Sequence, residues 1–101
     1  MRKRVIISGK VQGVFFRDFC RRKAIELQIT GWVRNNSDGT VEAVFEGEPQ
    51  DVEKIVLWCH KGPPRAVVTK VDVVYETQEN SPHRNSHNLE DGEQITNFLI
   101  C

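Results

Sequence analysis

Apolar and polar positions repeat along the chain with two different periods, and the change between them separates strands from helices. Residues 3–8 (KRVIIS) predict a strand, because β-branched and other apolar residues dominate a short run. Residues 29–35 (ITGWVRN) predict a second strand for the same reason. Between these strands, helical spacing gathers most of the apolar residues on one side: Phe16, Phe19, Cys20, Ala24 and Leu27. The first third of the chain therefore predicts a strand, a helix and a strand.

A β-hairpin is predicted next. Residues 37–39 (SDG) supply the turn, because glycine accepts the left-handed backbone that tight turns require. Residues 40–47 (TVEAVFEG) then alternate between two faces, with Val41, Ala43 and Phe45 on one and Glu42 and Glu46 on the other. The second strand and this segment are therefore expected to pair as a hairpin.

The second helix has signals at both of its ends. Pro49 suits the first helical turn, and Gly62 can end the helix ahead of Pro63 and Pro64, which cannot continue it. Its apolar stripe follows the i, i+3, i+4, i+7 pattern and consists of Val52, Ile55, Val56 and Cys59. A helix between these signals is predicted to bury that stripe.

The remainder of the chain predicts two strands joined by a polar loop. Residues 66–76 repeat with period two, which places four residues on one side: Val67, Val71, Val73 and Tyr75. Residues 77–92 contain one large apolar residue, Leu89, so we expect a mobile loop that buries too little to repay its ordering. Residues 94–100 (QITNFLI) predict a short final strand.

The order β-α-β-β-α-β predicts an α+β fold of the ferredoxin-like split βαβ type. In this arrangement two helices pack on one face of a four-stranded antiparallel sheet. The last short segment is available as an extra edge strand. The length of 101 residues suits one domain spanning residues 1–101.

Charge and composition narrow the class of protein. Lys and Arg together number 14, as do Asp and Glu, so the basic surface that nucleic acids or anionic membranes require is absent overall. The apolar runs are too short for a membrane span or a signal peptide. Three widely spaced cysteines form no metal-binding or disulfide pattern. We expect a cytoplasmic monomer with reduced thiols that binds neither nucleic acid nor membrane.

The strongest candidate for chemistry is the strand–loop–helix junction at residues 9–17 (GKVQGVFFR). A loop that opens a helix presents unpaired backbone N–H groups and the positive end of the helix dipole to an anion. Arg17 would lie in the first helical turn, where its planar guanidinium could donate two hydrogen bonds to one phosphate. The alternative is that Gly9 and Gly13 only shape a turn and that Arg17 is a surface charge.

Read together, VQGVFFR, GWVRNNSDGTVEAVFEG and KGPPRAVVTKV resemble the acylphosphatase family, in order and across residues 4–76. The resemblance implies that Arg17 binds the substrate phosphate, that Asn35 orients the attacking water and that Thr40 supplies a supporting hydroxyl. It further implies a loop whose backbone amides cradle the phosphate, made of Lys10, Val11, Gln12, Gly13, Val14, Phe15 and Phe16. Many relatives have glycine where this chain has Phe15, and the loop at residues 77–92 is long for the family.

The resemblance implies hydrolysis of acyl phosphates to a carboxylate and inorganic phosphate, with phosphate as product and inhibitor. A carboxylate leaving group has a conjugate acid of pKa about 4 and needs no general acid. Phosphoryl transfer then asks mainly for positioning and for neutralisation of the phosphoryl oxygens. We therefore expect no metal and no cofactor.

Four other interpretations of the sequence are possible. Residues 59–65 (CHKGPPR) have the spacing of a cysteine-dependent phosphatase, but they follow a helix, and two prolines remove N–H groups from the cradle. His83 and His87 are four apart, yet they lie in a loop-like segment without partner ligands. An RNA-binding module of the same topology would carry an aromatic pattern that is absent here. A non-catalytic phosphate- or partner-binding module remains the main alternative.

Overall fold

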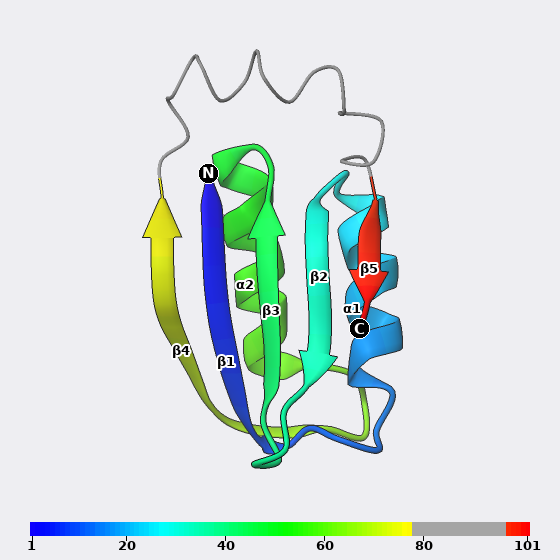
Figure 1. Cartoon of the computed structure of the whole chain (residues 1–101). Coiled ribbons are helices and arrows are strands. Elements are labelled where there is room, and N and C mark those ends of the chain that lie inside the picture. The colour runs from blue at the N-terminus through cyan, green and yellow to red at the C-terminus, as the bar shows by residue number, and fades with distance from the viewer. Residues whose placement is uncertain (78–96) are drawn as a thin grey trace.

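Five strands form one sheet in the spatial order β4-β1-β3-β2-β5, and two helices cover one of its faces (Figure 1). The computed structural model describes residues 1–77 and 97–101. Along the chain the elements are β1 (Arg2–Lys10), α1 (Phe16–Glu26), β2 (Thr30–Asn35), β3 (Val41–Glu46), α2 (Pro49–Lys61), β4 (Val67–Thr77) and β5 (Phe98–Ile100). The predicted order of strands and helices is confirmed.

The sheet is mixed because its last strand runs parallel to its neighbour. Strand β1 pairs antiparallel with β3 and β4, and β2 pairs antiparallel with β3. Strand β5 adds to the free edge of β2 in the parallel direction (Figure 1). The ferredoxin-like α+β class is therefore confirmed, with β5 as the extra edge. The predicted mobile loop at residues 77–92 lies outside the described residues, apart from Thr77 at the end of β4.

Helix α2 buries the whole stripe that its sequence predicts, whereas only part of the stripe predicted for α1 is buried, because Phe19 and Leu27 are half-buried. In α2, Pro49 occupies the first turn, Gly62 with φ 72° ends the helix, and every residue of the predicted stripe is buried. In α1 the buried residues are Phe16, Cys20 and Ala24. The Phe16 ring lies against Trp58 of α2 with a centroid separation of 5.3 Å, which joins the two helices above the sheet. Each fully buried large side chain in this core stabilises the fold by about 1.5–3 kcal/mol.

The predicted face of β4 is wrong at its first residue. Val67 is 57% exposed, whereas its neighbour Val68 packs against the core together with Val71. The cause is a register shift between Ser8 and Gly9 of β1, where one extra residue of β4 reverses the alternation. Gly9 suits this irregularity because a Cβ there would lie 2.1 Å from the Val67 carbonyl oxygen.

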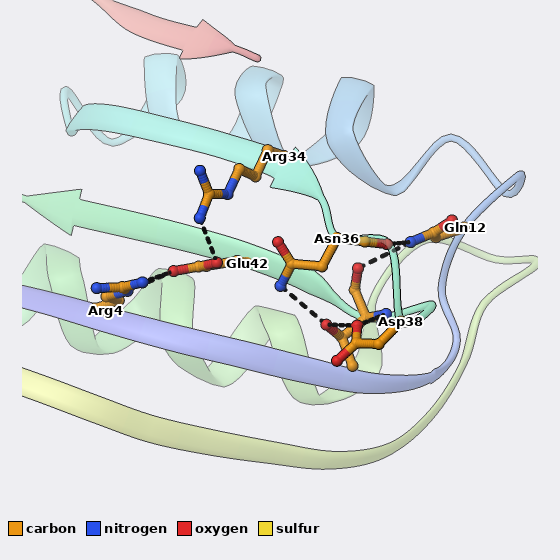
Figure 2. Close-up of polar contacts among 7 residues, drawn as sticks. Arg4, Gln12, Arg34, Asn36, Asp38 and Glu42 are labelled. Carbon is orange, nitrogen blue, oxygen red and sulfur yellow. Dashed lines mark hydrogen bonds and ion pairs between the residues drawn. The ribbon is translucent and has the colours of Figure 1, made fainter.

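The face of the sheet without helices contains a buried carboxylate. Glu42 is only 3% exposed because Arg4 of β1 and Arg34 of β2 lie on either side of it (Figure 2). The Nη2 of Arg34 donates to Glu42 at 2.9 Å, and Arg4 donates to the other carboxylate oxygen. Burial raises the pKa of Glu42, but the hydrogen bonds from Arg34 and Arg4 outweigh it and leave this pKa below its usual value.

Candidate active site

A pocket of about 310 Å³ opens at the N-terminal end of α1, beside the end of β2. It brings together residues from three separate parts of the chain: the loop after β1 with the first turn of α1, the last residue of β2 and the last residue of β5. The lining residues are Val11, Gly13, Phe15, Phe16, Arg17, Asp18, Asn35 and Ile100. Arg17 and Asn35, which the sequence assigns to one site, therefore face the same pocket.

The remaining predicted site residues lie around this pocket without lining it. Lys10 is exposed at the end of β1, and Val14 is buried in the core. Gln12 and Thr40 belong to the contact between the loop and the β2–β3 turn. Of the predicted loop, Val11, Gly13, Phe15 and Phe16 reach the pocket. Val11 and Phe16 are at the same time core residues, which anchors the loop.

The loop between β1 and α1 has backbone donors to offer. Within the described chain, the N–H groups of residues 12–15 donate no hydrogen bond to another residue. The N–H groups of the first turn of α1 have no partner within the helix either. Gly13 has φ +76° and open space around its Cβ position, so the chain can turn here without strain. Unpaired N–H groups at a helix N-terminus form a ready site for an anion.

Phe15 is the N-cap residue of α1 and adopts the left-handed conformation, with φ 66° and ψ 26°. Its carbonyl accepts the first helical hydrogen bond, from the N–H of Phe19 at 3.0 Å. This conformation costs a non-glycine residue on the order of 1–2 kcal/mol. The ring is nevertheless 63% exposed and gains little from packing. A glycine would adopt this conformation without that cost.

Arg17 and Asn35 present unpaired polar groups to the pocket. Among residues 1–77 and 97–101, neither the Arg17 guanidinium nor the Asn35 carboxamide makes a hydrogen bond or ion pair with another side chain or carbonyl. Arg17 is half-buried in the first turn of α1, and Asn35 is half-buried at the end of β2. Asn35 lies on the same face of β2 as the core residue Val33, because side chains alternate along a strand. Both groups are therefore available to a ligand.

Gln12 holds the loop against the β2–β3 turn. Its Nε2 donates to the carbonyl oxygens of Asn36 at 2.7 Å and Thr40 at 2.9 Å (Figure 2). The turn is closed by Thr40, whose hydroxyl donates to Asp38 at 2.7 Å and accepts from the Asn36 amide at 3.0 Å. The hydrogen bonds from the Thr40 hydroxyl and N–H lower the pKa of Asp38. These contacts fix the loop relative to the strand that carries Asn35.

Two residues that line the pocket, Asp18 and Ile100, were not predicted from the sequence. Asp18 directly follows Arg17, and its carboxylate pairs with Arg22 one turn later at 3.1 Å. Its position next to Arg17 could have signalled that it reaches the pocket. Ile100 reaches the pocket because β5 pairs with β2 and sets Ile100 beside Val33. No local signal could have found this contact, since it depends on a pairing between distant segments.

The rival phosphatase interpretation has no support in the geometry. Cys59 is fully buried in the core, so its thiol cannot reach a substrate. All three cysteines are free, and burial together with a hydrogen bond to Cys59 raises the pKa of Cys20. No group of three potential ligands suited to a metal occurs in the described part of the chain, and His83 and His87 lie outside it. Within residues 1–77 and 97–101, no helix is long and apolar enough to cross a membrane.

The structure is an α+β protein with a ferredoxin-like sheet, and the loop ahead of its first helix has unpaired backbone N–H groups among the described residues. Comparison with known proteins shows its family. The acylphosphatase family model matches residues 3–88. An acylphosphatase of Pelotomaculum thermopropionicum is 55% identical over 75 residues, covering 74% of this chain and 82% of the relative. An acylphosphatase of Rubrobacter xylanophilus is 59% identical over 75 residues, covering 74% and 68%.

The solved structure of an acylphosphatase from Coxiella burnetii matches with a TM-score of 0.78 at 38% identity, covering 99% of this chain and 90% of that one. The chain belongs to the acylphosphatase family. It is accordingly an enzyme, a hydrolase with the acylphosphatase activity of that family.

Proposed function

We propose that this chain hydrolyses the carboxyl–phosphate bond of acyl phosphates by dividing the work between two parts of the pocket. The loop at residues 10–16 and Arg17 hold the phosphoryl group, and Asn35 positions the water that attacks it. The products are a carboxylate and inorganic phosphate. Inorganic phosphate also binds the pocket as an inhibitor, because it carries the same oxygens as the transferring group.

The observation that carries this proposal is that Arg17 and Asn35 line one pocket and that both lack partners among the described residues. A guanidinium that makes no ion pair within the protein can donate to two phosphoryl oxygens. The free N–H groups of residues 12–15 lie in the loop that borders the same pocket. Together these donors can neutralise the charge that phosphoryl transfer spreads over the equatorial oxygens.

Asn35 suits the nucleophile because a carboxamide can accept a hydrogen bond from a water and donate one to it. The carboxylate leaves without protonation, since its conjugate acid has a pKa of about 4. The proton of the water can pass to the substrate phosphate itself, so the reaction needs no strong protein base. Asp18 is not required as a base, and its pairing with Arg22 at 3.1 Å limits its repulsion of the phosphate.

The test is hydrolysis of benzoyl phosphate and acetyl phosphate by the purified chain, before and after exhaustive treatment with EDTA. We expect turnover in both conditions with the same kcat, because the proposed steps use only donors of the chain. Loss of activity that a divalent ion restores would contradict the metal-free mechanism. Saturable binding of inorganic phosphate without any turnover would favour a non-catalytic binding module instead.

We also propose that residues 1–101 form one domain and that the enzyme is a cytoplasmic monomer. The neutral charge balance and the three free thiols support this setting. Sedimentation equilibrium tests the monomer directly, and a mass twice that of the chain would contradict it.

A further inference from the structure

The lining of the pocket divides into a polar part and an apolar part. Arg17, Asp18, Asn35 and the loop at Gly13 make up the polar part, and the proposed function assigns all of these except Asp18 to phosphate and water. Two apolar lining residues, Val11 and Phe16, are 1% and 2% exposed and offer almost no surface to a ligand. The other two, Phe15 and Ile100, are 63% and 42% exposed. The accessible apolar surface of the pocket therefore comes from Phe15 and Ile100.

Phe15 keeps a large ring exposed in a backbone conformation that favours glycine, with φ 66°. It is absent from the core cluster and from the ring–ring contacts of the described residues. Residues with strained backbone conformations are concentrated at functional sites, where the side chain contacts a ligand and not the core. Phe15 lies one residue before the helix and two before Arg17, and it lines the pocket with Arg17.

Ile100 is held at the pocket by the edge strand β5. It pairs with Val33 of β2, and the N–H of Cys101 donates to the Val33 carbonyl at 2.9 Å. Arg21 of α1 donates to the Phe98 carbonyl at 3.2 Å, which ties β5 to the helix. Figure 1 shows the C-terminal end of β5 beside the first turns of α1. Phe15 and Ile100 form what we call the rim of the pocket, and the contacts of β5 with β2 and α1 fix the strand that carries Ile100.

We propose, on the basis of the proposed function, that Phe15 and Ile100 bind the acyl part of the substrate and favour aromatic or branched acyl phosphates over acetyl phosphate. Once the phosphoryl group occupies the polar part, the carboxyl-linked group extends along the remaining lining. An aromatic acyl group can pack on the Phe15 ring and cover Ile100, whereas a methyl group is too small to contact both. Apolar contact adds affinity with the area that it removes from water.

The experiment measures kcat/KM for benzoyl phosphate and acetyl phosphate and follows their ratio. Phe15→Ala and Ile100→Ala should each lower the benzoyl-to-acetyl ratio by about 3- to 10-fold, the scale of losing one aromatic or aliphatic contact. Matched controls are Leu99→Ala, the neighbour of Ile100 that is 55% exposed outside this pocket, and Ile25→Ala on α1, 54% exposed. Both controls should keep the wild-type ratio. An unchanged benzoyl-to-acetyl ratio in Phe15→Ala and Ile100→Ala would contradict the proposal that these residues bind the acyl group.

The variant Phe15→Gly distinguishes a structural role of Phe15 from a role in substrate binding. Glycine relieves the positive φ, so Tm should stay level or rise while the ratio falls. A fall in Tm with an equal loss for both substrates would show that Phe15 serves the fold and would contradict the proposal.

If the wild-type chain hydrolyses neither substrate, the proposed function fails. The role of Phe15 and Ile100 in binding an apolar group is then tested by ligand affinity. Phenylphosphonate should then bind more tightly than methylphosphonate, and Phe15→Ala should remove the difference. The same difference in affinity in the wild type and in Phe15→Ala would contradict the proposal that Phe15 binds the apolar group.

Discussion

Arginines at two places in this molecule have opposite surroundings. On the face of the sheet without helices, Arg4 and Arg34 donate to the same buried carboxylate, Glu42 (Figure 2). At the pocket, Arg17 has no such partner among the described residues. The first two guanidinium groups are committed to the fold because they compensate a buried charge. Among the described residues Arg17 makes no contact of this kind, so its donors are available to a ligand, as the proposed binding of phosphate requires.

Arg17→Ala should have the largest effect on activity. Arginines that stabilise a transferring phosphoryl group contribute on the order of 10³–10⁵ in rate. Inhibition by inorganic phosphate should weaken as well, because Arg17 holds the phosphate before and during the reaction. Arg17→Lys should restore little, since a point charge lacks the planar fork. The measurements are kcat and the phosphate inhibition constant, with Tm close to that of the wild type.

The matched control for Arg17 is Arg34→Ala, which removes a partner of Glu42 at 2.9 Å. This variant should lose stability and keep kcat. A folded Arg17→Ala protein with unchanged phosphate inhibition would reject the assignment of Arg17.

Asn35→Ala should reduce kcat by about 10²–10³, the scale of losing one well-placed polar group in an active site. Phosphate inhibition should change little, because Arg17 and the loop N–H groups still hold the anion. Asn36→Ala, one residue later, is the control: its amide donates to the Thr40 hydroxyl at 3.0 Å, so its loss should weaken the turn and affect kcat far less. A greater loss of kcat in Asn36→Ala would show that Asn35 is not the residue that positions the water.

Glu42→Gln should leave activity unchanged and lower the free energy of unfolding by about 1–3 kcal/mol, the range for charged hydrogen bonds in a buried site. Because the pKa of Glu42 is lower in the folded chain than in the unfolded one, its contribution is complete above the unfolded pKa of about 4.3. The contribution is lost as pH falls through the folded pKa. Urea unfolding should therefore show wild type and variant converging in acid.

The exposed pair of Lys70 and Asp72, 3.5 Å apart, provides the comparison for Glu42. Asp72→Asn should change stability by less than about 1 kcal/mol, as exposed pairs do. An equal loss of unfolding free energy in Glu42→Gln and Asp72→Asn would show that burial does not make the Glu42 contacts stronger than an exposed ion pair.

Sequence patterns predicted the parts of this fold that depend on local spacing. The stripe from Val52 to Cys59 is buried because its period matches the helix, and Gly62 ends that helix as expected. Val67 was misplaced because a bulge in the pairing with β1 reverses the alternation, and nothing in residues 66–76 alone reveals it. The burial of Glu42 was missed because its arginines come from two other strands.

The candidate site divides in the same way. The loop and Arg17 are contiguous in the chain, so one segment could reveal them. The resemblance to acylphosphatases added Asn35, whose position in the same pocket agrees with the role proposed for it. Ile100 reaches the pocket only through the pairing of β5 with β2. Its contribution therefore became visible in three dimensions alone.

The most direct measurement is a titration of the ¹⁵N-labelled chain with inorganic phosphate, followed by NMR of backbone amides and arginine side chains. We expect saturable shifts, with one Kd, at the Arg17 side chain and at the amides of residues 12–16. The side-chain signals of Arg4 and Arg34 should stay in place, because Glu42 already occupies their donors. Saturable shifts at Arg4 or Arg34 with Arg17 unmoved would contradict the assignment of Arg17 as the arginine that binds phosphate.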